Sequence, residues 1–138
     1  MTKKHILVLG SGSVGKRHMK NFASLGCAIS AMDPRADRLD DAAKEFKILN
    51  NFSSLDDALA SGQKFDAAVV ASPPKFHIDQ TIALLKAGMP VLLEKPLSKT
   101  LDEAKQLSHF LTSHYPPLIL GYTYRRWPSL IELKNKIL

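Results

Sequence analysis

The chain has 138 residues, 45% of them hydrophobic and 23% charged, and its formal net charge is +6. This length predicts one domain with a sizeable core, and the composition excludes the disordered and fibrous classes. Lysine and arginine are spread along the chain in runs of no more than two, so we expect no nucleic-acid-binding surface.

Cysteine usage and hydropathy bear on the compartment. Cys27 is the single cysteine, so no disulfide can form within the chain, and we expect a cytoplasmic location. No apolar run is long enough to span a bilayer, and we expect no membrane partner. The first apolar strand directly follows the segment Met1-Thr2-Lys3-Lys4, so we expect no signal peptide.

Short apolar runs alternate with segments of helical periodicity along the chain. Strands are expected at residues 6–9, 28–32, 47–50, 65–71, 91–93 and 118–124. Helices are expected at residues 13–25, 34–46, 53–61, 75–87, 101–113 and 128–138. The run from Ala67 to Ala71 does not alternate with polar residues, which indicates a strand buried on both faces. This order predicts the α/β class: a doubly wound parallel sheet of about six strands with flanking helices.

Local signals mark the ends of several helices. Gly26 is expected to stop the first helix. Ser53 with Asp56, and Thr100 with Glu103, have the spacing of a capping box at a helix start. The buried face of the first helix would include Val14, Met19, Phe22 and Leu25.

A glycine-rich segment joins the first strand to the first helix with the spacing G-x-G-x-x-G. Gly10 would allow a tight turn, Gly12 would leave room for a pyrophosphate, and Gly15 would let the helix pack against the strand. The free N–H groups and the dipole at the helix start favour an anion there. An ordinary glycine-rich turn is the alternative. The residues expected to hold the pyrophosphate are Gly10, Ser11, Gly12, Ser13, Val14 and Gly15.

Asp33 ends the second strand, about 20 residues past the glycines, where a carboxylate can accept hydrogen bonds from the adenosine ribose. Because Pro34 follows, the alternative role is a turn residue or helix cap, and an aspartate can serve in both ways.

The segments after the later strands are expected on the same rim of the sheet, because ligands bind beyond the carboxyl ends of such strands. They read A-S-P-P-x-x-H from Ala71 to His77, Glu-Lys-Pro from Glu94 to Pro96, and a tyrosine- and arginine-rich run from Tyr122. With the glycines and Asp33, in this order, they resemble the Gfo/Idh/MocA oxidoreductase family over essentially the whole chain. That resemblance implies an enzyme that uses NAD or NADP to oxidise or reduce a carbon of a sugar- or cyclitol-like substrate.

The same resemblance assigns roles to the Glu-Lys-Pro residues. It places Lys95 beside the nicotinamide and the substrate hydroxyl, as the catalytic residue that helps to move the hydroxyl proton. Glu94 would orient Lys95 or contact the cofactor. The alternative for both residues is simple surface charge.

The resemblance also extends the cofactor site to Ser72, Pro73 and His77, with no catalytic role for the histidine. A helix entry capped by Ser72 is the alternative for that loop. Arg35 and Arg38 would lie along the adenine or neutralise a 2′-phosphate, or else belong to a solvated helix face. Asp33 would repel a 2′-phosphate, so NAD is favoured, while the arginines leave NADP open.

Members of the family place a substrate domain after the sixth strand. We therefore expect residues 1–124 to form the NAD(P)-binding Rossmann domain and residues 125–138 to begin the connection to a second domain absent here. That domain would supply further acid–base residues, and any homo-oligomer would form through it, so this chain alone is expected to be inactive. The alternative function is a non-catalytic NAD(P)-binding sensor or interaction module. A methyltransferase binding S-adenosylmethionine is a weaker third, because it has no evident use for Glu-Lys-Pro.

Overall fold

A parallel sheet organises the chain. The computed structural model describes residues 3–111 and 115–137. The strands are β1 (His5–Leu9), β2 (Ala28–Met32), β3 (Ile48–Phe52), β4 (Ala67–Val70), β5 (Val91–Leu93) and β6 (Leu118–Leu120). They form a six-stranded sheet in the order β3-β2-β1-β4-β5-β6, and each neighbouring pair is parallel. This order, which reverses direction between β1 and β4, confirms the predicted doubly wound fold.

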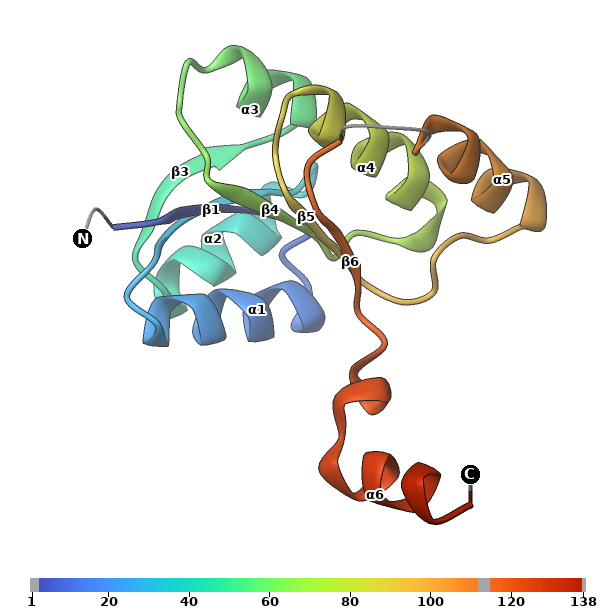
Figure 1. Ribbon diagram of the computed structural model, residues 1–138. Helices are drawn as coiled ribbons and strands as arrows, with labels where there is room; N and C mark the ends of the chain where they lie inside the picture. The colour runs from blue at the N-terminus through green and yellow to red at the C-terminus, as the bar shows by residue number, and fades with distance from the viewer. Residues whose placement is uncertain (1–2, 112–114, 138) are drawn as a thin grey trace.

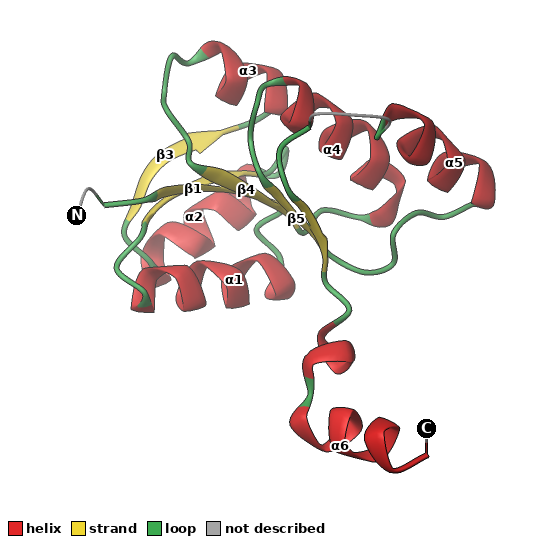
Figure 2. Cartoon of the chain, in the orientation of Figure 1, coloured by secondary structure: helices red, strands yellow, loops and turns green. Residues whose placement is uncertain are grey.

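Helices cover both faces of the sheet (Figure 1). The helices of the chain are α1 (Ser13–Ser24), α2 (Ala36–Glu45), α3 (Leu55–Ala60), α4 (His77–Lys86), α5 (Leu101–Phe110) and α6 (Pro128–Ile137), and all but α6 take part in this cover. Figure 2 shows α1 and α2 on one face of the sheet and α3, α4 and α5 on the other. Two short 3₁₀ helices, η1 (Pro74–Phe76) and η2 (Thr123–Arg126), precede α4 and α6. No helix in the described ranges is long and apolar enough to cross a membrane.

The sheet separates two hydrophobic cores because successive side chains of a strand point to opposite faces. On β1, Leu7 and Leu9 face the core that contains Leu84 of α4. Ile6 and Val8 face the core beneath α1 and α2. β1 is therefore apolar on both faces. The prediction that β4 is buried on both faces is confirmed, because Val70 lies in the first core and Val69 in the second.

The strand register aligns the carboxyl ends of all six strands, and Phe52 of β3 pairs with Met32 of β2. Leu9 of β1 pairs with Met32 of β2 and Val70 of β4, and the same row continues to Leu93 and Leu120. The residue after each of these positions therefore begins the same rim. Those residues are Gly10, Asp33, Ser53, Ala71, Glu94 and Gly121. The sequence motifs predicted Gly10, Asp33, Ala71 and Glu94 on this rim, but neither Ser53 nor Gly121.

Several predicted boundaries were wrong. The first helix ends at Ser24, and Leu25, expected on its buried face, is 76% exposed because it is already the C-cap. Ser54, not Ser53, caps α3 by accepting a hydrogen bond from the Asp57 N–H. The capping box of Thr100 and Glu103 is confirmed.

Further differences lie at the other predicted ends. The second helix starts at Ala36, the third strand runs on to Phe52, and the sixth ends at Leu120. After β6 the chain turns into η2 instead of continuing extended to Tyr124. The helix predicted over residues 101–113 reaches Phe110, and positions 112–113 lie outside the described residues.

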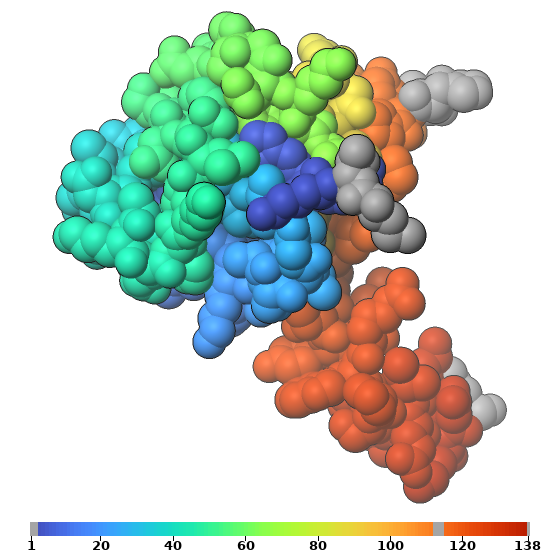
Figure 3. All heavy atoms as spheres, turned by 90° about the vertical axis from the view of Figure 1, so that its left-hand side faces the viewer, coloured from blue at the N-terminus to red at the C-terminus, as the bar shows by residue number. Residues whose placement is uncertain are grey.

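The C-terminal helix stands away from the sheet. Figure 3 shows the segment from η2 onward projecting from the body of the molecule. None of the residues of α6 is buried. Its exposed apolar side chains are Leu130, Ile131, Leu133 and Ile137.

Two glycines let α1 begin directly beneath the end of β1. Gly10 has a φ of +91°, a conformation that favours glycine. A Cβ added at Gly15 would lie 1.7 Å from the Gly10 carbonyl oxygen, closer than any side chain can approach. The close packing predicted for Gly15 is therefore a contact with the backbone of Gly10 itself.

We expect Gly15→Ala to lower the free energy of unfolding by about 3 kcal/mol or more, because the Gly10 backbone must move. The matched control is Gly62→Ala, since Gly62 has a φ of +70° but open space around it. This control should cost only about 1 kcal/mol, from the left-handed conformation alone. Urea unfolding followed by circular dichroism measures both changes. Equal losses would show that the contact between Gly15 and Gly10 is not the constraint.

Candidate functional site

The glycine loop is anchored to the end of β2 by hydrogen bonds. The Gly10 N–H donates to the Met32 carbonyl at 2.7 Å, and the Ser11 N–H donates to Asp33 Oδ2 at 2.8 Å. The other oxygen of Asp33 accepts the Arg35 N–H at 3.0 Å. Asp33 is 3% exposed, so its carboxylate is a buried anion held by backbone donors. It serves as a turn residue, while Arg35 takes the N-cap position of α2.

The start of α1 is open toward solvent. Gly12 is its N-cap, and no side chain caps the helix. The first backbone bond of the helix runs from the Lys16 N–H to the Gly12 carbonyl at 2.9 Å, so the N–H groups of Ser13 and Val14 have no acceptor within the helix. A Cβ on Gly12 would meet nothing closer than Arg38 Nη1, at 3.9 Å. This end of α1 can therefore receive an anion close to its backbone.

A cleft of about 730 Å³ opens beside this loop. Its walls include six residues that the sequence placed in the cofactor site. These are Gly10, Asp33, Arg35, Arg38, Ser72 and Pro73. Other lining residues were not predicted from the sequence, among them Ser53, Ser54, Leu55, Asp56, Phe76 and Gln80. Residues 53–56 directly follow β3. Ligands of such sheets bind beyond the carboxyl ends of the strands, so applying this principle to the third strand as well would have predicted these four residues.

The two arginines beside Asp33 differ in their partners. The guanidinium of Arg35 forms an ion pair with Asp37 and holds the pKa of that carboxyl below its ordinary value. The charge of Arg35 is thus largely met by a neighbour on the exposed side of α2. Arg38 Nη1 instead lies 3.8 Å from Asp33 Oδ2, at the edge of the cleft. Of the two, Arg38 is the cation that faces the glycine loop.

A buried histidine links the loops after β4 and β5. The ring of His77 is 1% exposed, and its nitrogens lie 2.8 Å from the Ser72 carbonyl oxygen and 2.7 Å from that of Pro96. The Ser72 hydroxyl donates to Gln80 Oε1 at 2.6 Å, so the alternative of Ser72 as a helix cap was wrong. His77 therefore contacts both loops, and it is not among the residues that line the cleft.

Glu94 and Lys95 occupy different environments although they are adjacent. The side chain of Glu94 is 9% exposed and lies 2.7 Å from His18 Nε2, so the alternative of a surface charge was wrong for this residue. Its Oε2 accepts the Lys95 N–H at 3.2 Å. Lys95 is exposed on the rim. His18 was not predicted from the sequence, although it lies one helical turn after Gly15 and so on the packed side of α1.

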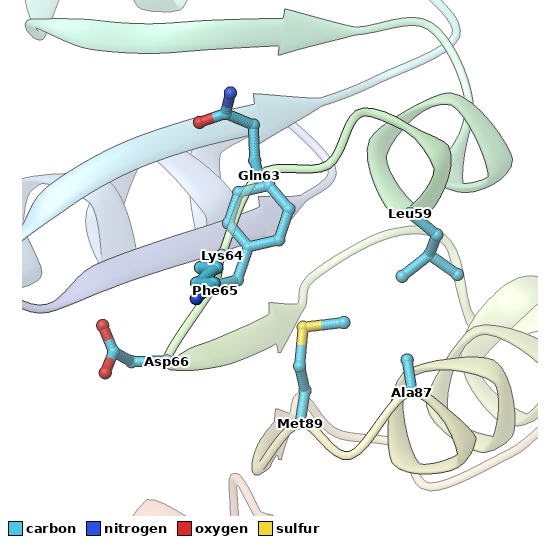
Figure 4. Close-up of a pocket in the computed structure, with 7 residues that line it drawn as sticks. All are labelled: Leu59, Gln63, Lys64, Phe65, Asp66, Ala87 and Met89. Carbon is cyan, nitrogen blue, oxygen red and sulfur yellow. The ribbon is translucent and has the colours of Figure 1, made fainter.

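A second cavity, of about 480 Å³, lies at the opposite end of the sheet (Figure 4). Phe65 and Met89, which line it, precede β4 and β5 and therefore mark the amino ends of the strands. Asp66 at this cavity already binds the Lys4 ammonium at 2.7 Å, which lowers the pKa of Asp66. This cavity does not share the rim on which the cofactor residues gather.

The chain is similar to known dehydrogenases. The model of the Gfo/Idh/MocA oxidoreductase family, with an NAD-binding Rossmann fold, matches residues 4–122. An inositol 2-dehydrogenase of Corynebacterium glutamicum is 36% identical over 134 residues, which are 94% of this chain and 40% of that protein.

Solved structures agree with this match. Scyllo-inositol dehydrogenase from Lactobacillus casei, with bound NAD(H) and scyllo-inositol, has a TM-score of 0.85 at 25% identity. The WlbA dehydrogenase from Bordetella pertussis, in complex with NADH and UDP-GlcNAcA, has a TM-score of 0.87 at 27% identity. Each similarity covers 99% of this chain but only 41% and 42% of the respective structure. The chain thus spans about two fifths of the length of these relatives.

We expect Gly12→Val to weaken NADH binding by about 100-fold, because the side chain would hold the pyrophosphate away from the N–H groups of α1. The free energy of unfolding should change by less than about 1 kcal/mol, since the position is open in the folded protein. Titration calorimetry with NADH and urea unfolding measure the two effects. Unchanged affinity would contradict the role of the glycine loop.

Proposed function

This chain belongs to the Gfo/Idh/MocA oxidoreductase family, as its motifs indicated, and we propose that it forms the NAD-binding part of a dehydrogenase. The proposed reaction is hydride transfer between NAD and a CH–OH carbon of a sugar- or cyclitol-like substrate. One observation carries this proposal: the glycine loop that leads into the anion-receptive end of α1 is hydrogen-bonded through the Ser11 N–H to the buried Asp33, with the exposed Lys95 on the same rim.

The parts of the cofactor can be assigned to this rim. We place the pyrophosphate at the N–H groups that follow Gly12 and the adenosine ribose at Asp33, whose oxygens keep unused lone pairs. The adenine would enter the cleft bounded by Arg38 and Pro73. The nicotinamide would then extend toward Glu94 and Lys95, past the other side of the glycine loop.

Lys95 is proposed as the catalytic residue. NAD, when bound, accepts the hydride that leaves the substrate carbon. The Lys95 amine would hold the substrate hydroxyl and take part in moving its proton, a task that needs a flexible side chain on a fixed backbone. The hydrogen bond from the Lys95 N–H to Glu94 supports that requirement.

The segment after β6 is proposed to lead to a substrate domain. We assign residues 1–124 to the cofactor-binding unit and residues 125–138 to the connection. Two observations support this division: α6 has no buried residue, and the relatives are more than twice as long as the chain they match.

We propose a cytoplasmic location for the protein. The only cysteine of the sequence, Cys27, is a free thiol, which supports a reducing compartment.

We expect Asp33→Asn to weaken NADH binding by about tenfold, because a charged acceptor for the ribose hydroxyls is lost. NADPH binding should fall less or rise, since removal of the carboxylate leaves Arg38 free to meet a 2′-phosphate. Titration calorimetry with NADH and with NADPH gives the ratio of the two affinities. Asp56→Asn, at the same cleft, is the matched control and should leave the ratio unchanged. If Asp33→Asn also left it unchanged, Asp33 would be a turn residue only.

We expect Lys95→Met to keep NADH affinity within about twofold of the unaltered chain and to lower kcat by about 100-fold or more. Turnover is measured in the protein expressed from the complete gene, with inositols and UDP-sugars as substrates and absorbance of NADH as the signal. An unaltered kcat would remove Lys95 from the mechanism. NADH binding without turnover of any substrate would favour a sensor or interaction module.

A further inference from the structure

His18 and Glu94 form a largely buried contact between elements 76 residues apart in the sequence. His18 Nε2 lies 2.7 Å from Glu94 Oε1, and the two side chains are only 14% and 9% exposed. Phe22, one turn along α1, stacks beside the His18 ring with centroids 6.5 Å apart. A carboxylate only accepts hydrogen bonds when ionised, so the imidazole N–H is its donor.

The rest of Glu94 is equally constrained. Its N–H donates to the Val70 carbonyl at 3.0 Å, which continues the pairing of β4 with β5 by one residue. A Cβ at Gly121 would lie 3.3 Å from Glu94 Oε2, so the backbone after β6 closes against this carboxylate. Oε2 is left with the Lys95 N–H as its donor, at 3.2 Å. The side chain of Glu94 thus reaches from α1 to the backbone of Lys95.

We infer that His18 is a positioning residue for Lys95, acting through Glu94. The inference rests on the proposed function, because it concerns the same lysine. α1 begins at the predicted pyrophosphate site and carries His18 one turn beyond Gly15. The His18–Glu94 contact therefore sets the distance between the loop that binds the cofactor and the loop that carries Lys95. Errors of about 1 Å in such a distance lower catalytic rates strongly.

Loss of the His18 imidazole would leave the Glu94 side chain free to move. A buried carboxylate without a donor admits water or turns toward another donor. Either movement withdraws Oε2 from the Lys95 N–H. The other support of the segment, from His77 to the Pro96 carbonyl, would remain. We therefore expect a local change at Lys95 and an intact glycine loop.

The test compares His18→Leu, which keeps bulk without a donor, with His18→Gln, whose amide nitrogen reaches the position of Nε2. Affinities of the 138-residue chain for NADH and for ADP-ribose, which lacks the nicotinamide, are measured by calorimetry. We expect His18→Leu to weaken NADH by about tenfold and ADP-ribose by less than about twofold, because the backbone segment around Lys95, once displaced, would enter the space proposed for the nicotinamide. Truncation of the Lys95 side chain alone leaves that backbone in place and so does not have this effect. His18→Gln should restore the NADH affinity. His109→Leu, which removes an exposed histidine of α5, is the matched control and should change neither affinity.

A second measurement reads the Lys95 amide directly. In the free protein, hydrogen exchange at the Lys95 N–H should accelerate by about tenfold in His18→Leu and return to the original rate in His18→Gln. Should His18→Leu not fold, His18→Asn serves in its place, because its amide donor stops short of Glu94. It is expected to behave as described for the leucine variant.

Two outcomes would overturn the inference. The first is an unchanged NADH affinity with unchanged exchange at Lys95. The second is an equal loss for NADH and ADP-ribose, which would assign His18 to the glycine loop or to general stability. If the unaltered chain bound neither ligand, the proposed function would fail, while exchange at Lys95 would still decide whether His18 fixes that segment.

Discussion

The hydrogen bond from the Ser11 N–H to the buried Asp33 carboxylate is the contact on which the site depends. A carboxylate that is 3% exposed is stable only if donors surround it, and here the backbone provides them. By accepting the Ser11 N–H, the same carboxylate fixes the glycine loop against the end of β2. Gly10 lies against the Ala71 carbonyl and Gly15 against the Gly10 carbonyl, so the loop has no freedom to move toward the sheet. The anion-receptive end of α1 is thereby held at one place on the rim.

The loops after β4 and β5 are held by side chains and not by glycines. His77 joins the Ser72 and Pro96 carbonyls, and His18 holds the carboxylate of Glu94. Both histidines lie beneath the rim, where bulk solvent does not compete for their hydrogen bonds. Lys95 is left with a fixed backbone and an exposed side chain. A fixed backbone with an exposed amine suits the proton-moving role that we propose for Lys95.

The fold leaves one region without a packing partner within the described residues. η2 and α6 carry exposed aromatic and aliphatic side chains, among them Tyr124, Trp127 and Leu133. Tyr124 and Trp127 stack on each other with centroids 5.1 Å apart, which covers part of their surface locally. The residues that we assign to the cofactor all lie outside this region. The chain enters it from the carboxyl end of β6, on the rim that carries Lys95, so we propose that it borders the substrate side of the site.

The sequence by itself determined the alternation of strands and helices, the glycine spacing, Asp33 at the end of β2 and the capping box at Thr100. These are patterns between near neighbours, and local periodicity and backbone geometry decide them. It did not determine that Leu25 is exposed, that Ser54 is the cap, or that the loop after β3 lines the cleft. Nor did it show that Glu94 is buried, because nothing near Glu94 in the chain covers it. His18, 76 residues away, meets it only when the crossovers bring α1 beside the end of β5. Burial of a charge depends on which distant elements pack around it, and the tertiary structure alone supplies that information.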